Sequence, residues 1–263
     1  MERKNSPRAH KRSSIEAQPH EALSPPVTLC VICYGPHVDL ARRFLESLYS
    51  RTDPLLFNLR AGLNEVEPAT SKLFDEFATR YGNIELFVEP RNIFKNPLMR
   101  RMFNEKPLTS RWTIWCDDDT HFTRKDWLEK LGRRIQKYPQ VSLWGALYFL
   151  TSRKPQALKW IRTARWYRRV PFKWEVQDDG TKAVRFVFAT GGFWAMRTEV
   201  LQQLDWPDPR LVHAGEDVLL SEALRQNGHP IGHFEQGVRI NDAPRRNPSA
   251  PEVVKLTPPG RVW

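Results

Sequence analysis

The sequence contains no long hydrophobic run. Nowhere in its 263 residues does it approach the roughly 18–20 consecutive apolar residues that a membrane-spanning helix needs. Residues 1–26 are polar and charged, and they lack the apolar segment of a signal peptide. We therefore expect no transmembrane segment, no secretory signal and a cytoplasmic location.

Cysteine is scarce, with Cys30, Cys33 and Cys116 as the complete set. Three cysteines in or beside expected core strands do not form a disulfide framework, so we expect reduced, buried thiols. The spacing of Cys30 and Cys33 is that of a redox motif. The pair lies within an expected strand instead of opening a helix, which argues against redox chemistry.

Two nucleotide-binding fingerprints are also missing. The chain has neither a phosphate-binding P-loop nor a Gly-x-Gly-x-x-Gly pattern. Because these glycine-rich turns hold the phosphates in many kinases and dehydrogenases, their absence argues against both classes.

What the sequence does have is positive charge, a formal net charge of +11. Such a balance predicts an anionic partner. Nucleic acid, phosphorylated small molecules and acidic membrane surfaces all meet this condition, and charge alone does not choose among them.

Apolar runs and helical patterns alternate along the chain. This alternation predicts an α/β fold with an open, mixed, mainly parallel sheet and helices on both faces. Expected strands are 27–33, 55–61, 84–88, 112–116, 141–150 and 183–189, and expected helices are 39–50, 68–81, 97–104, 125–137 and 216–226. We expect a single domain over 27–242, a disordered basic tail at 1–26 and a C-terminal tail at 243–263.

Three consecutive carboxylates, Asp117, Asp118 and Asp119, follow the expected strand 112–116. Ligands of open α/β sheets bind beyond the carboxyl ends of the strands, where Tyr34 and Asn64 would join this run. Three clustered carboxylates are costly unless a cation or strong hydrogen-bond donors share their charge, and oxygen ligands suit Mg²⁺ or Mn²⁺. The alternative is a solvated acidic turn.

The order of these motifs resembles the family 2-like GT-A glycosyltransferases over residues 27–242. The resemblance rests on the first strand with its tyrosine, the aspartate run, and two later elements, Gly191-Gly192 and Gly215-Glu216-Asp217. It implies a GT-A fold with a nucleotide-binding half at 27–120 and an acceptor-binding half at 121–242. It also implies a Mn²⁺- or Mg²⁺-dependent enzyme that moves a sugar from a nucleotide-diphospho-sugar, expected to be UDP-linked, to an acceptor hydroxyl with inversion.

The resemblance also implies roles for the acids. Asp119 would be the chief metal ligand, with Asp117 as a second ligand or near the ribose. Asp118 would belong to the donor site or cap the turn. Asp217 would be the base and Glu216 would orient a substrate. Acids at a helix N-terminus are also favoured by the helix dipole, so capping is the alternative for this pair.

The same resemblance places Tyr34, Asn64 and Arg100 or Arg101 on the nucleoside. Gly191 and Gly192 would let the backbone approach a sugar, with Trp194 as an aromatic wall beside it. Near the C-terminus, where similar enzymes often have a histidine, Arg245 and Arg246 offer a different solution by folding over the diphosphate. Asn64 departs from the family, which usually has an acidic residue there. The alternative for the glycines is a tight turn, and for the two C-terminal arginines a solvated tail. We expect His121 to be a surface residue, and His229 and His233 to be structural.

Residues 153–174 carry eight Lys or Arg residues and five aromatic residues. We expect an acceptor-side flap. The alternatives are a stripe of Trp160, Ala164 and Tyr167 packed on the sheet, a platform for single-stranded nucleic acid, or contact with an anionic membrane. The acceptor would be a glycan, a lipid-linked sugar or another hydroxyl compound, and a membrane acceptor would place the enzyme at the inner membrane face.

Two other functions compete. A Mg²⁺-dependent nucleotidyltransferase also places carboxylates at strand ends, but it usually has a glycine-rich basic loop after the first strand, where this chain has residues 34–37 without a Lys or Arg. A nucleic-acid-binding module would use the basic-aromatic segment. That function does not explain acids at two expected loop positions.

Overall fold

A computed structural model describes residues 23, 26–152, 155–213, 215–240 and 254–255 of the chain. Most of the two expected tails lies outside the described residues, and so do Arg245 and Arg246.

The strands follow the expected order. They are β1 Val27–Gly35, β2 Phe57–Val66, β3 Ile84–Glu89, β4 Trp112–Asp117, β5 Thr120–Phe122, β6 Leu143–Ser152, β7 Trp174–Val176, β8 Lys182–Arg197, β9 Ile231–His233, β10 Val238–Ile240 and β11 Val254–Lys255. The helices are α1 Val38–Arg51, α2 Pro68–Tyr81, α3 Lys95–Asn104, α4 Trp127–Lys137, α5 Pro155–Arg162, α6 Thr198–Gln203 and α7 Glu216–Gln226, with a 3₁₀ turn at Pro54–Leu56.

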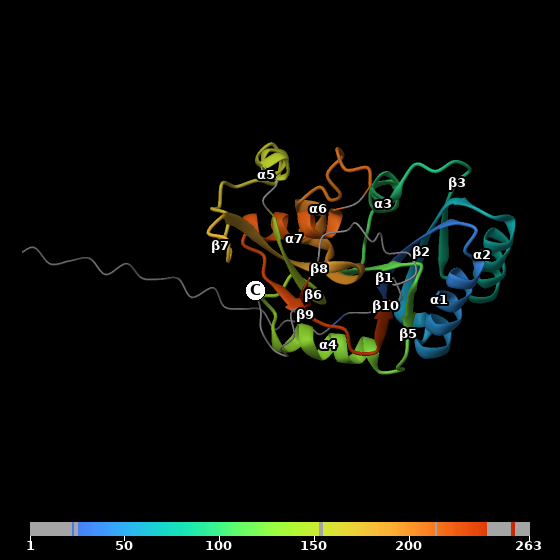
Figure 1. Ribbon diagram of the computed structural model, residues 1–263. Coiled ribbons are helices and arrows are strands. Elements are labelled where there is room, and N and C mark those ends of the chain that lie inside the picture. Colours follow the sequence, from blue (N-terminus) through green and yellow to red (C-terminus); the bar gives the residue numbers. More distant parts are fainter. Residues whose placement is uncertain (1–22, 24–25, 153–154, 214, 241–253, 256–263) are drawn as a thin grey trace, which may run out of the picture.

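The main sheet has the order β11-β6-β8-β4-β1-β2-β3, with β7 added beside β8 and β9 beside β6 (Figure 1). Strands β3, β2, β1 and β4 are parallel neighbours, whereas β8 is antiparallel to both β4 and β6. Tyr34 lies opposite Asn64, and Ile32 lies opposite Asp117. The parallel register therefore confirms that these strand ends meet at one edge of the sheet.

Helices cover both faces of the sheet, as predicted (Figure 1). Helices α1, α2 and α4 pack in one hydrophobic cluster, and α3, α5, α6 and α7 pack in another. Successive β1 side chains divide between them, since Val31 joins the first cluster and Ile32 the second. Because both faces of β1 are covered, side chains that point either way must be apolar, which explains the continuous apolar run in the sequence.

Strand β8 differs from the prediction. It runs through Gly191 and Gly192 without the expected turn and pairs with β4 beyond them. The register between β6 and β8 shifts at Gly145, so the sheet accommodates the glycines through an irregularity in the pairing. Glycine in this strand allows close approach of other groups and does not end the strand.

The basic-aromatic segment packs against the domain. Trp166 and Phe172 are buried, while Trp160 and Tyr167 pack partly buried against the same cluster. Helix α5 ends at Arg162, before the expected stripe is complete, although Ala164 is also buried. The segment therefore packs against the core, as one of the alternatives predicted, and its role as an acceptor-side flap stays a prediction.

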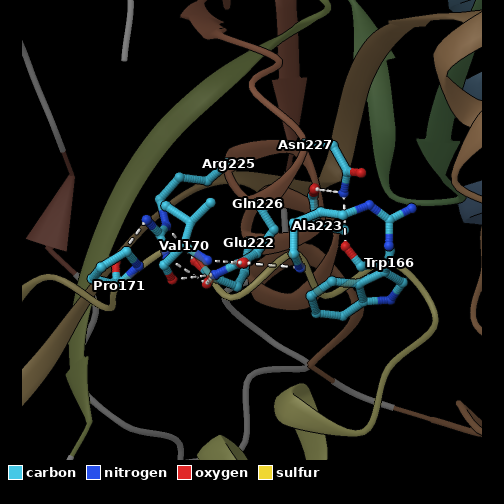
Figure 2. A network of polar contacts seen from close by, with 9 residues as sticks. Trp166, Val170, Pro171, Glu222, Ala223, Arg225, Gln226 and Asn227 are labelled. Carbon is cyan, nitrogen blue, oxygen red and sulfur yellow. Dashed lines mark hydrogen bonds and ion pairs between the residues drawn. The ribbon is translucent and has the colours of Figure 1, made fainter.

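Polar contacts fasten this segment to α7 (Figure 2). Gln226 accepts hydrogen bonds from the backbone N–H groups of Arg168 and Val170, and it donates to the Val170 carbonyl and to Glu222. Arg225 pairs with Glu222 through two contacts of 2.7 Å. The segment is thereby joined to the helix whose first residues are Glu216 and Asp217.

Gln226→Leu is expected to lower the free energy of unfolding by roughly 3 kcal/mol, because buried backbone groups lose their partners. Urea unfolding measures the loss. The matched control is Gln202→Leu, at an exposed glutamine that donates a 3.3 Å bond to the Leu108 carbonyl. An equal effect of both variants would contradict the anchoring role of Gln226.

Candidate active site

A cavity of about 640 Å³ lies at the carboxyl edge of the parallel strands. Its lining brings together the predicted residues Tyr34, Asn64, Asp117, Asp118, Asp119, Gly191, Gly192, Glu216 and Asp217. Residues separated by a hundred positions in the sequence therefore share one site.

Lys95 bridges the two acidic halves of the cavity. Its Nζ lies 2.8 Å from Oδ1 of Asp117 and 2.7 Å from Oε1 of Glu216. Burial opposes protonation, but the two carboxylates outweigh it and raise the Lys95 pKa. The ammonium also lies over the Trp115 ring, 5.5 Å from its centroid. Sequence reasoning missed this lysine.

Asp217 has the properties of a base near neutral pH. Burial, followed by the adjacent Glu216 carboxylate, raises its pKa to about 6. Burial would also raise the pKa of Glu216, but Lys95 outweighs it and the net shift is downward. One carboxyl thus stays ionised while its neighbour titrates within reach of physiological pH, an arrangement typical of acid–base catalysis.

The helix start explains why these acids face the cavity. Gly215 takes the left-handed conformation, φ 76°, as the residue before α7. The backbone N–H of Val218 donates to Oδ1 of Asp217 at 2.8 Å. Capping and lining the cavity are therefore compatible roles for Asp217.

Gly191 gives these groups room. A Cβ atom at this position would lie 3.4 Å from Oε1 of Glu216, 3.6 Å from Cβ of Asp217 and 3.7 Å from Nζ of Lys95. A larger side chain would occupy the space in front of all three groups. The bare backbone of β8 therefore keeps this part of the cavity open to a substrate.

The aspartate run forms the turn between β4 and β5. Asp118 and Asp119 are largely buried, and Arg43 donates to the Asp119 carbonyl at 3.2 Å. Asp117 accepts from Trp115 Nε1 at 3.1 Å in addition to its Lys95 contact. A buried turn with these contacts is not the solvated acidic turn of the alternative interpretation.

Arg100 and Arg101 do not line this cavity. Arg100 binds Asp205 and the Pro207 carbonyl, while Arg101 pairs with Glu89 and Glu105. Both side chains are held by these partners outside the cavity lining, and Arg101 reaches the last residue of β3. The structure therefore does not bring these two arginines together with the other predicted residues, and their contact with the nucleoside stays a prediction.

Trp194 is not a cavity wall either. It is 2% exposed and stacks on Trp115, with ring centroids 6.1 Å apart. The continuous β8 pairs Trp194 with Trp115 inside the sheet, so its ring packs in the core. Among the Phe, Tyr and Trp residues, Tyr34 and Phe94 line the cavity, and both are exposed.

Three histidines singled out in the sequence, His121, His229 and His233, lie outside the cavity lining. His121 is half-buried on β5, where burial and then Arg43 lower its pKa. His229 contacts the Ser142 hydroxyl, and His233 accepts the Leu147 N–H. The latter two contacts are structural, in agreement with the sequence expectation.

Within the described residues, no group of three or more His, Cys, Asp or Glu side chains is arranged to hold a metal ion. The cavity instead offers the few carboxylates of one turn. This ligand set suits Mg²⁺ or a similar ion when substrate phosphates complete its coordination.

Comparison with known proteins decides the family. Residues 25–255 match the family described as Glycosyltransferase like family 2. The chain belongs to this family. Membership makes it a glycosyltransferase-type enzyme, so it favours neither the nucleotidyltransferase nor the nucleic-acid-binding interpretation. A search of curated protein sequences gave no match.

Solved structures share the GT-A fold. A mannosyltransferase from Pyrobaculum calidifontis, in complex with GDP-Man and Mn²⁺, is 15% identical, with a TM-score of 0.50 over 78% of this chain and 53% of that chain. GalNAc-T7 with UDP, GalNAc and Mn²⁺ is 14% identical, with a TM-score of 0.56 over 79% and 42%. S. aureus TarS 1-349 is 12% identical, with a TM-score of 0.50 over 80% and 58%. This chain thus spans roughly half the length of these solved chains.

None of the helices within the described ranges is both long and apolar enough to cross a membrane.

Proposed function

We propose that this glycosyltransferase transfers a sugar from a nucleotide-diphospho-sugar to an acceptor hydroxyl in the cavity at the strand ends. The observation that carries the proposal is the Lys95 bridge, 2.8 Å from Asp117 and 2.7 Å from Glu216. Lys95 thereby connects two parts of the cavity. One is the aspartate turn, which suits a metal ion and a diphosphate, and the other is the start of α7, which carries the base Asp217. Transfer needs both functions beside one sugar.

In this proposal Asp217 accepts the proton of the acceptor hydroxyl. Its raised pKa suits a base near neutral pH. Glu216 stays ionised through Lys95 and orients a substrate, and Gly191 leaves room for the sugar. Direct attack by the activated hydroxyl on the anomeric carbon, opposite the leaving diphosphate, would invert that centre.

Asp119, Asp118 and Asp117 form the donor side. Mn²⁺ or Mg²⁺ would be held chiefly by Asp119, since the Asp117 carboxylate already contacts Lys95. The bound ion would supply Lewis-acid stabilisation of the diphosphate leaving group. Two of the similar structures carry Mn²⁺, which supports this choice.

The finer parts of the proposal are the donor nucleotide, the membrane contact and the location of the enzyme. A UDP-linked donor is supported by the UDP in one similar structure, while another holds GDP-Man. The positive net charge of the chain agrees with peripheral contact with an anionic membrane and with a lipid-linked acceptor. The cytoplasmic location stays a prediction.

A thermal-shift screen tests the proposal. UDP-, GDP- and TDP-sugars are added with and without Mn²⁺, and a ligand that binds the folded state raises the melting temperature. We expect one nucleotide class to stabilise the protein in a Mn²⁺-dependent manner. No shift with any of them would contradict the proposal.

Transfer is expected to depend on pH through Asp217. A base works only when it is deprotonated, so kcat should be constant above pH 7 and fall about tenfold per unit below the folded-state pKa of about 6. A kcat profile from pH 4.5 to 8.5 measures this. A profile flat down to pH 5 would contradict the assignment of the base.

A further inference from the structure

Phe94 lies at the cavity in a backbone conformation that glycine normally occupies. Its φ of 66° and ψ of 167° fall in a region that is strained for any residue with a Cβ atom. The residue is nevertheless 46% exposed, so burial does not offset the strain. A strained residue that presents an exposed aromatic ring to a cavity points to a binding role for that ring.

Two asparagines hold this conformation. Oδ1 of Asn92 accepts the Phe94 N–H at 2.7 Å and the Asn64 amide at 2.9 Å. Oδ1 of Asn64 accepts the Ile93 N–H at 3.0 Å, and Asn64 is 2% exposed. The side chain expected to contact a nucleoside is instead occupied in shaping the turn, so Asn64 is a positioning residue.

The Phe94 ring lies on the side of the cavity that carries the base. Its centroid is 6.3 Å from that of His213, which lies in the segment leading into α7, and both residues line the cavity. The Asn96 N–H donates to the Val212 carbonyl at 3.3 Å, which ties the two segments together. The next residue after Phe94 is Lys95, which contacts Glu216 at 2.7 Å.

We propose that Phe94 and His213 form a platform on which the ring of an acceptor sugar stacks beside Asp217. Sugar rings present an apolar C–H face that packs against aromatic surfaces, and the ring edges leave hydroxyls free to reach a base. Phe94 is then a specificity-determining residue, and the acceptor class is a glycoside. This inference rests on the proposed function and specifies its acceptor.

The binding test uses methyl hexopyranosides (glucoside, galactoside, mannoside and N-acetylglucosaminide) as probes, in the presence of UDP and Mn²⁺. Saturation-transfer NMR reports the contact, and titration gives the affinity. At least one glycoside should bind the native protein. Phe94→Ala should weaken it about fivefold or more while Phe94→Tyr retains it, because stacking on an aromatic ring contributes about that factor.

UDP binding separates this inference from the proposed function. The affinity for UDP with Mn²⁺ should be unchanged in Phe94→Ala and in Leu55→Ala, a control at a distant, 82% exposed apolar residue. Loss of UDP affinity in Phe94→Ala would place the ring against the nucleotide and overturn the platform. Binding of UDP with no glycoside bound, or glycoside binding unchanged in Phe94→Ala, would also overturn it. If the native protein bound none of UDP, GDP and TDP in the presence of Mn²⁺, the proposed function would be wrong, and the platform, which rests on it, with it.

The melting temperatures of two variants test the backbone strain at Phe94. A protein with alanine at a given position is normally more stable than one with glycine, because glycine loses more conformational freedom on folding. At position 94 the order should reverse, with Phe94→Gly melting about 2–4 °C above Phe94→Ala. Both variants should lose glycoside affinity equally, since both lack the ring. A melting temperature of Phe94→Gly below that of Phe94→Ala would contradict the strained conformation on which the inference depends.

Discussion

Asp217→Asn is expected to lower the rate of sugar transfer by about 10²–10⁴-fold, the usual contribution of a positioned base. Asparagine keeps the size of the side chain and an oxygen that can accept the Val218 N–H, 2.8 Å away in the native protein. It cannot accept the acceptor proton. The fall should therefore appear in kcat, with nucleotide affinity unchanged, and steady-state kinetics at saturating donor measures both.

The same substitution should stabilise the fold. A carboxyl whose pKa is raised in the folded state is destabilising once pH exceeds that pKa, because the unfolded chain ionises more easily. For Asp217 the pKa rises from 3.8 to about 6, so Asp217→Asn at pH 7.5 should raise the free energy of unfolding by roughly 2–3 kcal/mol. Asp75→Asn, at an exposed position on α2, is the control and should change neither activity nor stability. A variant of Asp217 with full transfer activity would refute its role as the base.

Asp119→Ala is expected to reduce transfer by about 10²-fold or more, because the ion that stabilises the leaving diphosphate loses its chief ligand. Removal of the metal by a chelator should have a comparable effect on the native enzyme. Kinetics over a range of Mn²⁺ concentrations should show a weaker apparent metal affinity in the variant.

Asp118→Ala provides the neighbouring control, because it removes a carboxylate from the same buried turn. Its effect on the Mn²⁺ dependence should be smaller than that of Asp119→Ala. Equal Mn²⁺ dependence in the native protein and in Asp119→Ala would rule out Asp119 as the chief ligand.

Local sequence patterns were sufficient to predict the fold. Helix α2 begins at Pro68, which suits a first helical turn, and the left-handed Gly82 ends it, so both bounds could be predicted. The buried strands β1 and β4 were equally clear, because continuous apolar runs are typical of strands covered on both faces. Polar and acidic residues at the ends of the expected strands then indicated which side chains would line the cavity.

The cavity was harder to predict where it depends on tertiary contacts. Lys95 is one of 41 Lys and Arg residues, and nothing near it in the sequence indicates that two distant carboxylates enclose it. Phe94 gives no local signal of its glycine-like conformation, which depends on Asn64 and Asn92. The sequence does not indicate the buried position of Trp194, because two adjacent glycines are typical of a turn, whereas the pairing of β8 with β4 continues the strand beyond Gly191 and Gly192.

Release of nucleotide diphosphate from a nucleotide-sugar tests the central claim most directly. With UDP-, GDP- and TDP-sugars as donors, the native protein should release UDP, GDP or TDP from one of the three donor classes. This release should require Mn²⁺ or Mg²⁺. Release should increase when a glycoside acceptor is added and fall by about 10²-fold or more in Asp217→Asn and Asp119→Ala. A folded native protein that releases none of the three nucleotides, or whose release is the same in both variants, would contradict the assignment of this cavity as the transfer site.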